Sequence, residues 1–272
     1  MFEPYLSRWE LVRDGEPLVT HSSRLLPVLY RGEQAMLKIA VETEEKRGGL
    51  LMLWWDGDGA ARVLAHEGDA LLLERATGPR SLEAMARDGR DNEASQIICA
   101  VAARLHAARG ALPPALVPLE EWFRELWPAA ETHGGILRRA ANTARALLDT
   151  PQEIGVLHGD LHHGNVLDFG PRGWLAIDPK RLVGERGFDF ANVLRNPDAH
   201  LAVAPDHLAL APGRLARQAS VVAEAAQLHR TRLLQWTLAF TGLSAAWIIG
   251  DGADPVLDLA VAELAASELD SR

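Results

Sequence analysis

Residues 158 to 165 read His158-Gly-Asp160-Leu-His-His-Gly-Asn165, and Trp174-Leu-Ala-Ile-Asp178-Pro179 follows them. Asp160 precedes Asn165 by five residues, and Asp178 ends a short apolar run. Phosphoryl transfer from MgATP uses one aspartate to accept a hydroxyl proton. It uses an asparagine and a second aspartate to hold metal between the phosphates. Loops of the form H-x-D-x-x-x-x-N are specific kinase signals, so the pattern predicts a small-molecule kinase.

Each of these side chains receives a role from its chemistry. Asp160 is expected to be the catalytic base, which accepts or orients the proton of the acceptor hydroxyl. Asn165 and Asp178 are expected to bind magnesium, because carboxamide and carboxylate oxygens are the hard ligands that this ion prefers. Asp168-Phe-Gly170 lies too close to Asn165 to replace Asp178, so we interpret Asp168 as a turn residue.

The three histidines of this stretch could instead suggest zinc. The glycines on either side argue against a regular helix, and no cysteine or further ligand is suitably placed. We therefore expect His158 to support the loop by hydrogen bonding. His162 and His163 could contact phosphate or substrate, or they could simply pack within the loop.

Lys38 is the second indicator of nucleotide binding. It lies within Ala35-Met-Leu-Lys-Ile-Ala40, and an ammonium group among apolar residues needs a partner because desolvating a charge is costly. An edge-strand lysine that faces water is the simpler alternative. Together with the downstream motif, the pattern favours contact with nucleotide phosphates and an ion pair with the following helix. Glu45 is preferred as partner over Glu42 and Glu44.

The remaining nucleotide contacts are assigned by position. Ser22 and Ser23 precede the first strand and could offer amide and hydroxyl donors to phosphate, although such residues are equally common in turns. The main chains of Glu74 and Ala76, after a predicted strand, are expected to bind adenine. The chain has no G-x-x-x-x-G-K-[ST] motif, which excludes a P-loop enzyme.

The composition of the 272 residues fits a globular enzyme. Apolar residues make up 48% and charged residues 24%. Cys99 is the only cysteine, so we expect a reducing cytoplasm rather than a disulfide framework. No signal peptide is recognisable, and no run approaches the roughly 20 apolar residues of a membrane span. The net charge of −9 argues against nucleic acid as a partner and suits a cationic substrate. No obligate protein partner is evident.

Hydrophobic periodicity predicts strands first and helices afterwards, an α+β plan with a cleft between two lobes. Residues 1–75 are expected to form the nucleotide-binding lobe, and residues 76–272 the catalytic and substrate-binding lobe. Strands are predicted at 25–30, 35–39, 62–65, 70–73, 156–157, 166–169 and 174–177, and helices at 42–55, 93–108, 120–133 and 137–148, with a kink or break at Pro128.

Several segments carry a resemblance to a known family. They include Leu157 to Gly170, Trp174 to Pro179 and Gly184-Glu-Arg-Gly-Phe-Asp-Phe-Ala-Asn192, with Thr20 to Ser23 and Thr241 to Trp247 in support. The chain resembles the aminoglycoside/hydroxyurea antibiotic resistance kinase family over nearly its whole length, and within it the streptomycin 6-kinases.

The resemblance implies a bilobal protein-kinase-like fold, ATP and Mg²⁺ as cofactors, and transfer of the γ-phosphoryl group to a hydroxyl of streptomycin at position 6. It also implies that Asp189 is a structural carboxylate behind the catalytic loop. Lys180 and Arg181 are more basic than expected beside the metal site, and they could assist phosphate binding or repel a cationic substrate.

Two other functions stay open. One is a kinase of the same fold that acts on a metabolic substrate such as an amino sugar, or on hydroxyurea, and the other is a silent kinase-like binding protein. The complete catalytic set argues against the silent protein. Candidate carboxylates for a cationic substrate are Glu120, Glu121, Glu185, Glu224, Asp251, Asp254 and Asp258. Trp236 and Trp247 are expected in the core rather than in a pocket wall.

Overall fold

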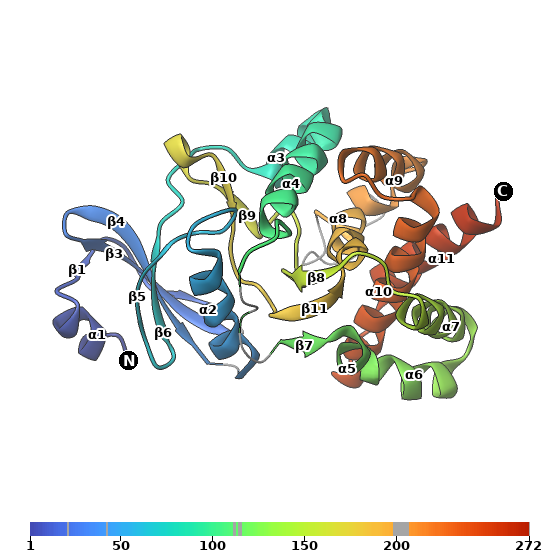
Figure 1. Ribbon diagram of the computed structural model, residues 1–272, viewed down its shortest axis with the longest axis horizontal. Helices are drawn as coiled ribbons and strands as arrows, with labels where there is room; N and C mark the ends of the chain where they lie inside the picture. The colour runs from blue at the N-terminus through green and yellow to red at the C-terminus, as the bar shows by residue number, and fades with distance from the viewer. Residues whose placement is uncertain (21, 42, 111–112, 114–115, 198–206, 272) are drawn as a thin grey trace.

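The chain forms an N-terminal sheet followed by a larger helical part. The computed structural model describes residues 1–20, 22–41, 43–110, 113, 116–197 and 207–271, and for residues 43–47 it describes the backbone alone. Figure 1 shows the sheet at one end of the molecule, the long helices at the other end, and short strands between them. The expected α+β arrangement is confirmed.

Six strands form the N-terminal sheet: β1 (Val12–Arg13), β2 (Leu18–Val19), β3 (Ser23–Tyr30), β4 (Glu33–Ala40), β5 (Val63–Glu67) and β6 (Ala70–Glu74). Their order is β1-β3-β4-β6-β5, β2 also pairs with β3, and every pair is antiparallel. Two helices belong to this part, α1 (Glu3–Arg8) and α2 (Thr43–Trp55).

The strands predicted at residues 25–30 and 35–39 correspond to β3 and β4, which form a hairpin. Tyr30 faces Glu33 across the turn Arg31-Gly32, and both turn residues have positive φ, 53° and 83°. Such a turn matches the twist of the flanking strands and fixes their register. The register places Lys38 between Leu25 of β3 and Leu71 of β6, in the middle of the sheet. The sheet therefore holds this lysine rigidly in a central strand, and the edge-strand alternative is wrong.

The helical part contains α3 (Leu82–Met85), α4 (Asp91–Leu105), α5 (Leu119–Trp122), α6 (Leu126–His133), α7 (Gly135–Asp149), α8 (Ala191–Arg195), α9 (Arg214–Ala225), α10 (Arg230–Gly250) and α11 (Val256–Asp270). Single helical turns lie at Ala86–Arg90, Phe123–Glu125, Gly170–Arg172, Arg186–Phe190 and Leu208–Leu210. The core helix is α10, which packs against α7, α8 and α11.

By length and composition α10 could cross a membrane. The sequence analysis predicted no apolar run of that length. In its most apolar window, however, 72% of the residues are buried inside the protein. Trp236, Leu238 and Leu243 of this helix are almost completely covered by neighbouring elements. Its apolar character is therefore that of a core helix.

The expected break at Pro128 is wrong. The helical segment is interrupted earlier, by the tight turn Phe123–Glu125, and α6 then runs through Pro128. Pro128 is the third residue of α6, where the backbone N–H would have no partner within the helix. A proline is tolerated at such a position and does not kink the helix.

Short strands frame the space between the sheet and the helices. They are β7 (Val117–Pro118), β8 (Ile154–Leu157), β9 (Val166–Asp168), β10 (Trp174–Ala176) and β11 (Leu182–Glu185). β9 pairs antiparallel with β10, while β11 lies between β7 and β8. The loop that carries Asp160 connects β8 to β9, and the segment that carries Asp178 connects β10 to β11. Both loops therefore open toward the same region.

The connection between the two parts is anchored at Gly78. Gly78 N donates to Asp168 O at 2.9 Å, and a Cβ atom added to Gly78 would lie 2.0 Å from Asp168 Cγ. Arg80 holds the Asp168 carboxylate with two hydrogen bonds of 2.7 and 3.0 Å, so that carboxylate has little freedom to move. Asp168 is thus the last residue of β9, and it binds the segment around Gly78 and Arg80 that joins the two parts. This is a structural role and not that of a metal ligand.

Gly78→Ala is expected to lower the free energy of unfolding by about 2 kcal/mol or more, because the new methyl group overlaps Asp168. Urea unfolding measures this loss. Gly110→Ala is the matched control, since a Cβ atom at Gly110 meets no atom of the described residues within 4 Å. Equal stabilities of the two variants would contradict the expected clash.

Candidate active site

Asp189 holds the loop that carries Asp160. Its carboxylate accepts hydrogen bonds from His158 N at 2.9 Å and Gly159 N at 2.7 Å, and His106 Nε2 lies 2.7 Å away. Burial by itself would raise the pKa of Asp189, but the hydrogen bond and charge of His106 outweigh it and keep the pKa below its usual value. The expected contact of Asp189 with the catalytic loop is present.

The side chain of His158 supports the same loop from within. Its Nε2 donates to Ile177 O at 2.8 Å, and its Nδ1 accepts from Asp160 N at 3.2 Å. The ring stacks on Trp55 with a centroid distance of 6.1 Å. Burial lowers the pKa of His158, so the ring is neutral. Because both ring nitrogens are used in the loop, His158 has the supporting role that we expected.

The other two histidines differ in position. His162 Nε2 lies 3.8 Å from Asp160 Oδ1, at the edge of the site. His163 is buried, and both of its ring nitrogens have no hydrogen-bond partner within the described part of the chain. Burial lowers the pKa of His163 to about 3. The described residues hold no group of three or more His, Cys, Asp or Glu side chains that could bind a metal ion.

Two amide groups hold the carboxylate of Asp160. Asn165 Nδ2 donates to Asp160 Oδ2 at 3.2 Å and to Asp160 O at 2.9 Å. Asn192 Nδ2 donates to the other oxygen, Asp160 Oδ1, at 2.9 Å. The Asp160 side chain remains 32% exposed. The carboxylate is therefore oriented from both sides while still open to an incoming hydroxyl group.

Lys38 forms an ion pair with Asp178. The two side chains meet at 2.7 Å, and the Lys38 side chain is only 5% exposed. The structure thus links the central strand β4 directly to one of the predicted metal ligands. The preferred partner of Lys38, Glu45, belongs to α2, but its side chain lies outside the described residues. Asp178 itself has a φ of 58°, an unusual conformation for a residue other than glycine.

The donor set at this point fits magnesium. Asn165 binds Asp160 through its amide nitrogen, which leaves the carboxamide oxygen as the atom suited to a metal. Asp178 contributes a carboxylate that is 35% exposed. One carboxylate and one amide oxygen are few protein ligands, as is usual for Mg²⁺, which keeps waters and binds substrate phosphates.

Of the two predicted phosphate-binding serines, Ser22 lies just before β3, and Ser23 is the first residue of that strand. Val41 N donates to Ser22 O at 2.8 Å, and Ser23 faces Ala40 at the end of β4, two residues beyond Lys38. The Ser23 hydroxyl group is buried and has no hydrogen-bond partner among the described residues. A buried hydroxyl group without a partner has donor capacity left for a ligand.

The two predicted adenine contacts differ. Glu74 N donates to Arg62 O at 3.0 Å, and the Glu74 carboxylate binds Arg172 and Arg62 N. The N–H of Glu74 is therefore committed to the sheet. Within the described chain, the backbone N–H and C=O of Ala76 form no hydrogen bond, so both are open to adenine.

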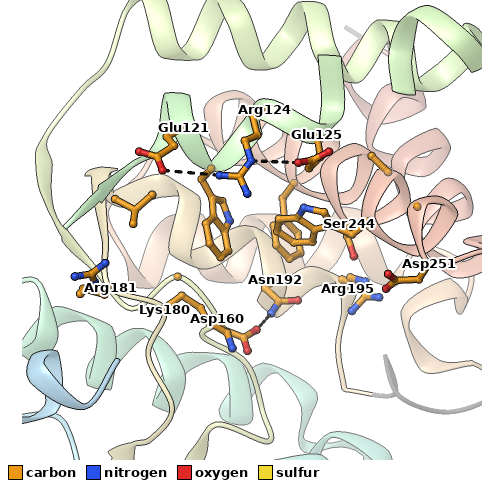
Figure 2. Close-up of a pocket in the computed structure, with 17 residues that line it drawn as sticks. Glu121, Arg124, Glu125, Asp160, Lys180, Arg181, Asn192, Arg195, Ser244 and Asp251 are labelled. Atoms are coloured by element: carbon orange, nitrogen blue, oxygen red, sulfur yellow. Dashed lines mark hydrogen bonds and ion pairs between the residues drawn. The ribbon is translucent and has the colours of Figure 1, made fainter. Parts of the chain in front are cut away.

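A cavity of about 740 Å³ opens beside Asp160. Trp122 and Trp247 form one wall, with their rings edge to face at 5.3 Å. Figure 2 shows Glu121 and Glu125 on the side of the cavity opposite Asp160. The cavity therefore combines aromatic surface with exposed carboxylates, which suits a cationic molecule with apolar faces.

Cationic side chains also line this cavity: Arg124, Lys180, Arg181 and Arg195. Arg124 lies between Glu121 and Glu125, at 3.8 and 3.1 Å from their carboxylates. Lys180 and Arg181 lie on the Asp160 side (Figure 2), and Lys180 N donates to His158 O at 2.6 Å. The two basic residues noted in the sequence thus face the acceptor cavity near the reacting centre.

Residues 8–252 match the family described as aminoglycoside/hydroxyurea antibiotic resistance kinase. The chain belongs to this family. It is 52% identical to the streptomycin 3″-kinase of Klebsiella pneumoniae, over 97% of this chain and 100% of that protein. It is 34% identical to the streptomycin 6-kinase of Streptomyces griseus, over 95% of this chain and 86% of that protein.

A solved structure shows the fold. The ternary complex of a thermostable mutant of aminoglycoside phosphotransferase APH(4)-Ia with ADP and hygromycin B has a TM-score of 0.65. The likeness covers 99% of this chain and 96% of that one, at 14% sequence identity. The expected protein-kinase-like fold is confirmed. As a member of this kinase family, the protein is an ATP-dependent phosphotransferase that acts on a hydroxyl group.

Several predicted substrate carboxylates of this kinase have other roles. Glu185 is buried and binds Arg232 and Trp236 Nε1, and Asp258 is buried in a bidentate pair with Arg195. These two predictions are wrong, because each carboxylate neutralises a cation inside the protein. Of the other candidates, Glu121 and Asp251 line the cavity, whereas Glu120, Glu224 and Asp254 do not.

Sequence reasoning missed other residues of the site. Glu125 lies four residues after Glu121, a spacing that puts both side chains on one helical face. This spacing could have indicated that Glu125 lines the same cavity. Asn192 ends one of the segments that carry the family resemblance, but its contact with Asp160 could not be predicted, because it joins segments 32 residues apart. Trp236 is buried as expected. Trp247 is half-buried: it packs against the core and also lines the cavity, so both alternatives hold in part.

Proposed function

We propose that this kinase transfers the γ-phosphoryl group of ATP to a hydroxyl of streptomycin and thereby confers resistance. The observation that carries the proposal is the cavity beside Asp160, with carboxylates opposite the reacting centre, in a chain that is 52% identical to a streptomycin 3″-kinase over 97% of its residues. Streptomycin carries guanidinium groups, and carboxylates recognise such groups by charge-assisted hydrogen bonds. The aromatic wall supplies surface for the sugar rings.

The position of transfer is part of the proposal. The sequence analysis favours the 6-hydroxyl, as in the relative that is 34% identical, but the more similar relative is a 3″-kinase. We therefore propose the 3″-hydroxyl and keep position 6 as the alternative. Phosphorus NMR of the purified product distinguishes the two positions, because the phosphate couples to a different ring proton in each.

In the proposed reaction, residues 1–75 bind the nucleotide and residues 76–272 bind the acceptor. Lys38 neutralises phosphate charge, and the Ser23 hydroxyl group and the main chain of Ala76 contact phosphate and adenine. Asp160 accepts the proton of the acceptor hydroxyl as the in-line transfer proceeds. Asn165 and Asp178 would hold Mg²⁺, whose charge would offset that of the phosphates. ATP and a reducing environment for Cys99 support the cytoplasm as the compartment.

Hydroxyurea and amino sugars are the alternative acceptors. Hydroxyurea has few atoms and would leave most of a cavity of about 740 Å³ unfilled, which favours the larger antibiotic. The test measures ADP release with streptomycin, other aminoglycosides, amino sugars and hydroxyurea. We expect the highest kcat/KM with streptomycin. Turnover of an amino sugar without turnover of streptomycin would refute the proposed substrate and retain the kinase chemistry.

The carboxylates of the cavity provide a specific prediction. Glu125→Gln and Asp251→Asn are each expected to raise the KM for streptomycin by about 10-fold, because a hydrogen bond between charged groups contributes about 1.5 to 3 kcal/mol. The kcat and the KM for ATP should stay within about twofold. Steady-state kinetics measures all three. Glu131→Gln, an exposed carboxylate on α6 that does not line the cavity, is the control. An unchanged KM in both test variants would show that the substrate cation binds elsewhere.

A further inference from the structure

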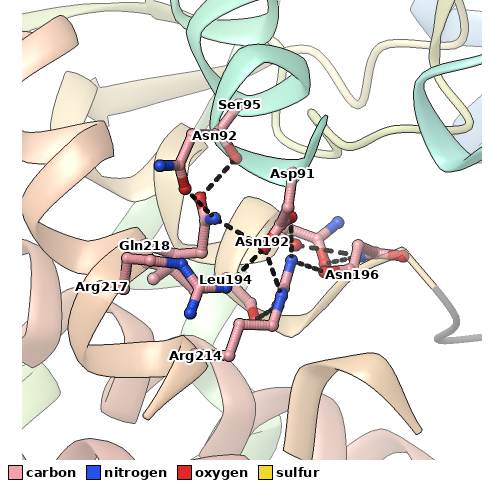
Figure 3. Close-up of polar contacts among 9 residues, drawn as sticks. All are labelled: Asp91, Asn92, Ser95, Asn192, Leu194, Asn196, Arg214, Arg217 and Gln218. Carbon is pink, nitrogen blue, oxygen red and sulfur yellow. Dashed lines mark hydrogen bonds and ion pairs between the residues drawn. The ribbon is translucent and has the colours of Figure 1, made fainter. Parts of the chain in front are cut away.

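Figure 3 shows a chain of hydrogen bonds that leads from the buried ion pair of Arg214 and Asp91 to Asn192. Asn192 in turn binds Asp160. Asn192, in α8, donates from Nδ2 to Asp160 Oδ1 at 2.9 Å. The other end of the same amide, Asn192 Oδ1, accepts from Asn196 Nδ2 at 2.9 Å. Asn196 Nδ2 also donates to Asn192 O at 3.0 Å. Both asparagines are buried, so these bonds are formed away from bulk water.

The far end of this chain is held by charge. Arg214 Nη2 donates to Asn196 O at 2.8 Å, and its Nη1 donates to Leu194 O at 3.1 Å. The guanidinium group of Arg214 binds the Asp91 carboxylate through two hydrogen bonds, both of 2.9 Å. Gln218 Nε2 adds a further bond to Asp91 at 2.6 Å. Since Arg214 and Asp91 are buried and fully engaged, the backbone of Asn196 has a fixed position.

This arrangement determines which way the Asn192 amide faces. An amide has donors at one end and an acceptor at the other. Because Asn196 presents an N–H donor, the oxygen of Asn192 points toward Asn196 and its nitrogen points toward Asp160. In the flipped orientation, two NH₂ groups would face each other and an amide oxygen would face the Asp160 carboxylate. Both contacts would be unfavourable in a buried site.

We propose that Asn192 and Asn196 are positioning residues for phosphoryl transfer, which hold the Asp160 carboxylate in the orientation that the acceptor hydroxyl requires. Asn165 restrains one carboxylate oxygen, and Asn192 restrains the other. Without Asn192 the carboxylate is held from one side only and can rotate. A base displaced by about 1 Å can lose roughly 100-fold in rate, so this restraint acts on the chemical step.

The inference rests on the proposed role of Asp160 as base. It also differs from a purely structural role, in which Asn192 would only join α8 to the catalytic loop. A structural role predicts a loss of stability, with substrate binding and turnover impaired together. A positioning role predicts a lower kcat while the KM values and the melting temperature stay close to those of the wild type.

The experiment compares Asn192→Ala, Asn192→Asp and Asn196→Asp with the wild type in steady-state kinetics and thermal unfolding. Asn192→Ala should lower kcat by about 10-fold, and Asn192→Asp by about 100-fold, because an acceptor then faces Asp160. Asn196→Asp does not touch Asp160, but it removes the donor that orients Asn192 and should lower kcat by about 10-fold. Both KM values should stay within about threefold. Asn142→Asp, an exposed residue of α7, is the control.

The outcomes separate this inference from the proposed function. A kcat within twofold of the wild type in Asn192→Asp or Asn196→Asp would overturn it, and so would a kcat loss matched by higher KM values and a lower melting temperature. If Asn192→Asp does not fold, Asn192→Ala and Asn196→Asp decide. If Asp160→Asn is inactive while the variants of Asn192 and Asn196 are fully active, the positioning role is refuted and the role of Asp160 as base stands. If Asp160→Asn is active, the role of Asp160 as base is refuted. If streptomycin is not the substrate, the same variants are compared with the acceptor, among those tested above, that the wild type phosphorylates.

Discussion

Asp160→Asn is expected to lower kcat by about 100-fold or more, the usual contribution of a positioned general base. An asparagine has nearly the shape of the aspartate, but its amide cannot take the proton of the acceptor hydroxyl. The ATP affinity should be almost unchanged, because Lys38 and Asp178 meet at 2.7 Å without the help of Asp160. Single-turnover and steady-state kinetics measure the chemical step, and calorimetry measures nucleotide affinity.

The variant also has a structural consequence that can be checked. Asn165 and Asn192 both donate to Asp160, and an asparagine at this position can accept with only one of its two terminal atoms. We expect a decrease in unfolding free energy of about 1 to 2 kcal/mol from the bond that is lost. Asp149→Asn, at the exposed end of α7, is the control. Turnover at the wild-type rate in Asp160→Asn would remove Asp160 from the reaction.

Local sequence patterns predict the parts of the site that depend on short-range geometry. Asp160 and Asn165 lie in one loop, so their spacing along the chain already determines that their side chains can meet. The β3–β4 hairpin is equally local, because a two-residue turn with positive φ sets the register of both strands. For such features the physical cause lies within a few residues.

Contacts between distant segments could not be predicted in the same way. The partner of Lys38 is 140 residues away, and Asn192 reaches Asp160 only because α8 packs behind the catalytic loop. Glu185 and Asp258 show the reverse case. Their charge suggests a substrate contact, but two half-buried arginines, Arg232 and Arg195, neutralise them. Whether a carboxylate faces a cavity or an internal cation depends on packing, which composition and spacing do not encode.

The resemblance to the kinase family predicts the type of reaction more firmly than the identity of the acceptor. The roles predicted for Asp160, Asn165 and Asp178 follow from what phosphoryl transfer from MgATP requires in general. One side of the cavity beside Asp160 is formed by α5, the turn after it and the end of α10, which contribute Glu121, Glu125 and Asp251 to the lining. Small changes in these elements can redirect the phosphoryl group to another hydroxyl without altering Asp160.

Asp178→Ala is expected to abolish the effect of magnesium on nucleotide binding. In the wild type, the carboxylate should tighten ATP binding through the metal, so that EDTA weakens it. In the variant, calorimetry with Mg²⁺ and with EDTA should give the same affinity. We expect kcat to fall by about 100-fold or more, since metal charge supplies several kcal/mol to the transition state.

The loss of this carboxylate also affects Lys38, whose ammonium group is 2.7 Å away and almost completely buried. Removing one partner of a buried pair is destabilising, so the melting temperature of Asp178→Ala must be measured beside its affinity. Asp178→Asn keeps an acceptor for Lys38 and separates the two effects, because it should restore stability without restoring the full magnesium effect. Asp254→Ala, an exposed carboxylate outside the cavity, is the control. If folded Asp178→Ala binds MgATP as tightly as the wild type does, Asp178 is not a metal ligand, and its contact with Lys38 is then its only role in the site.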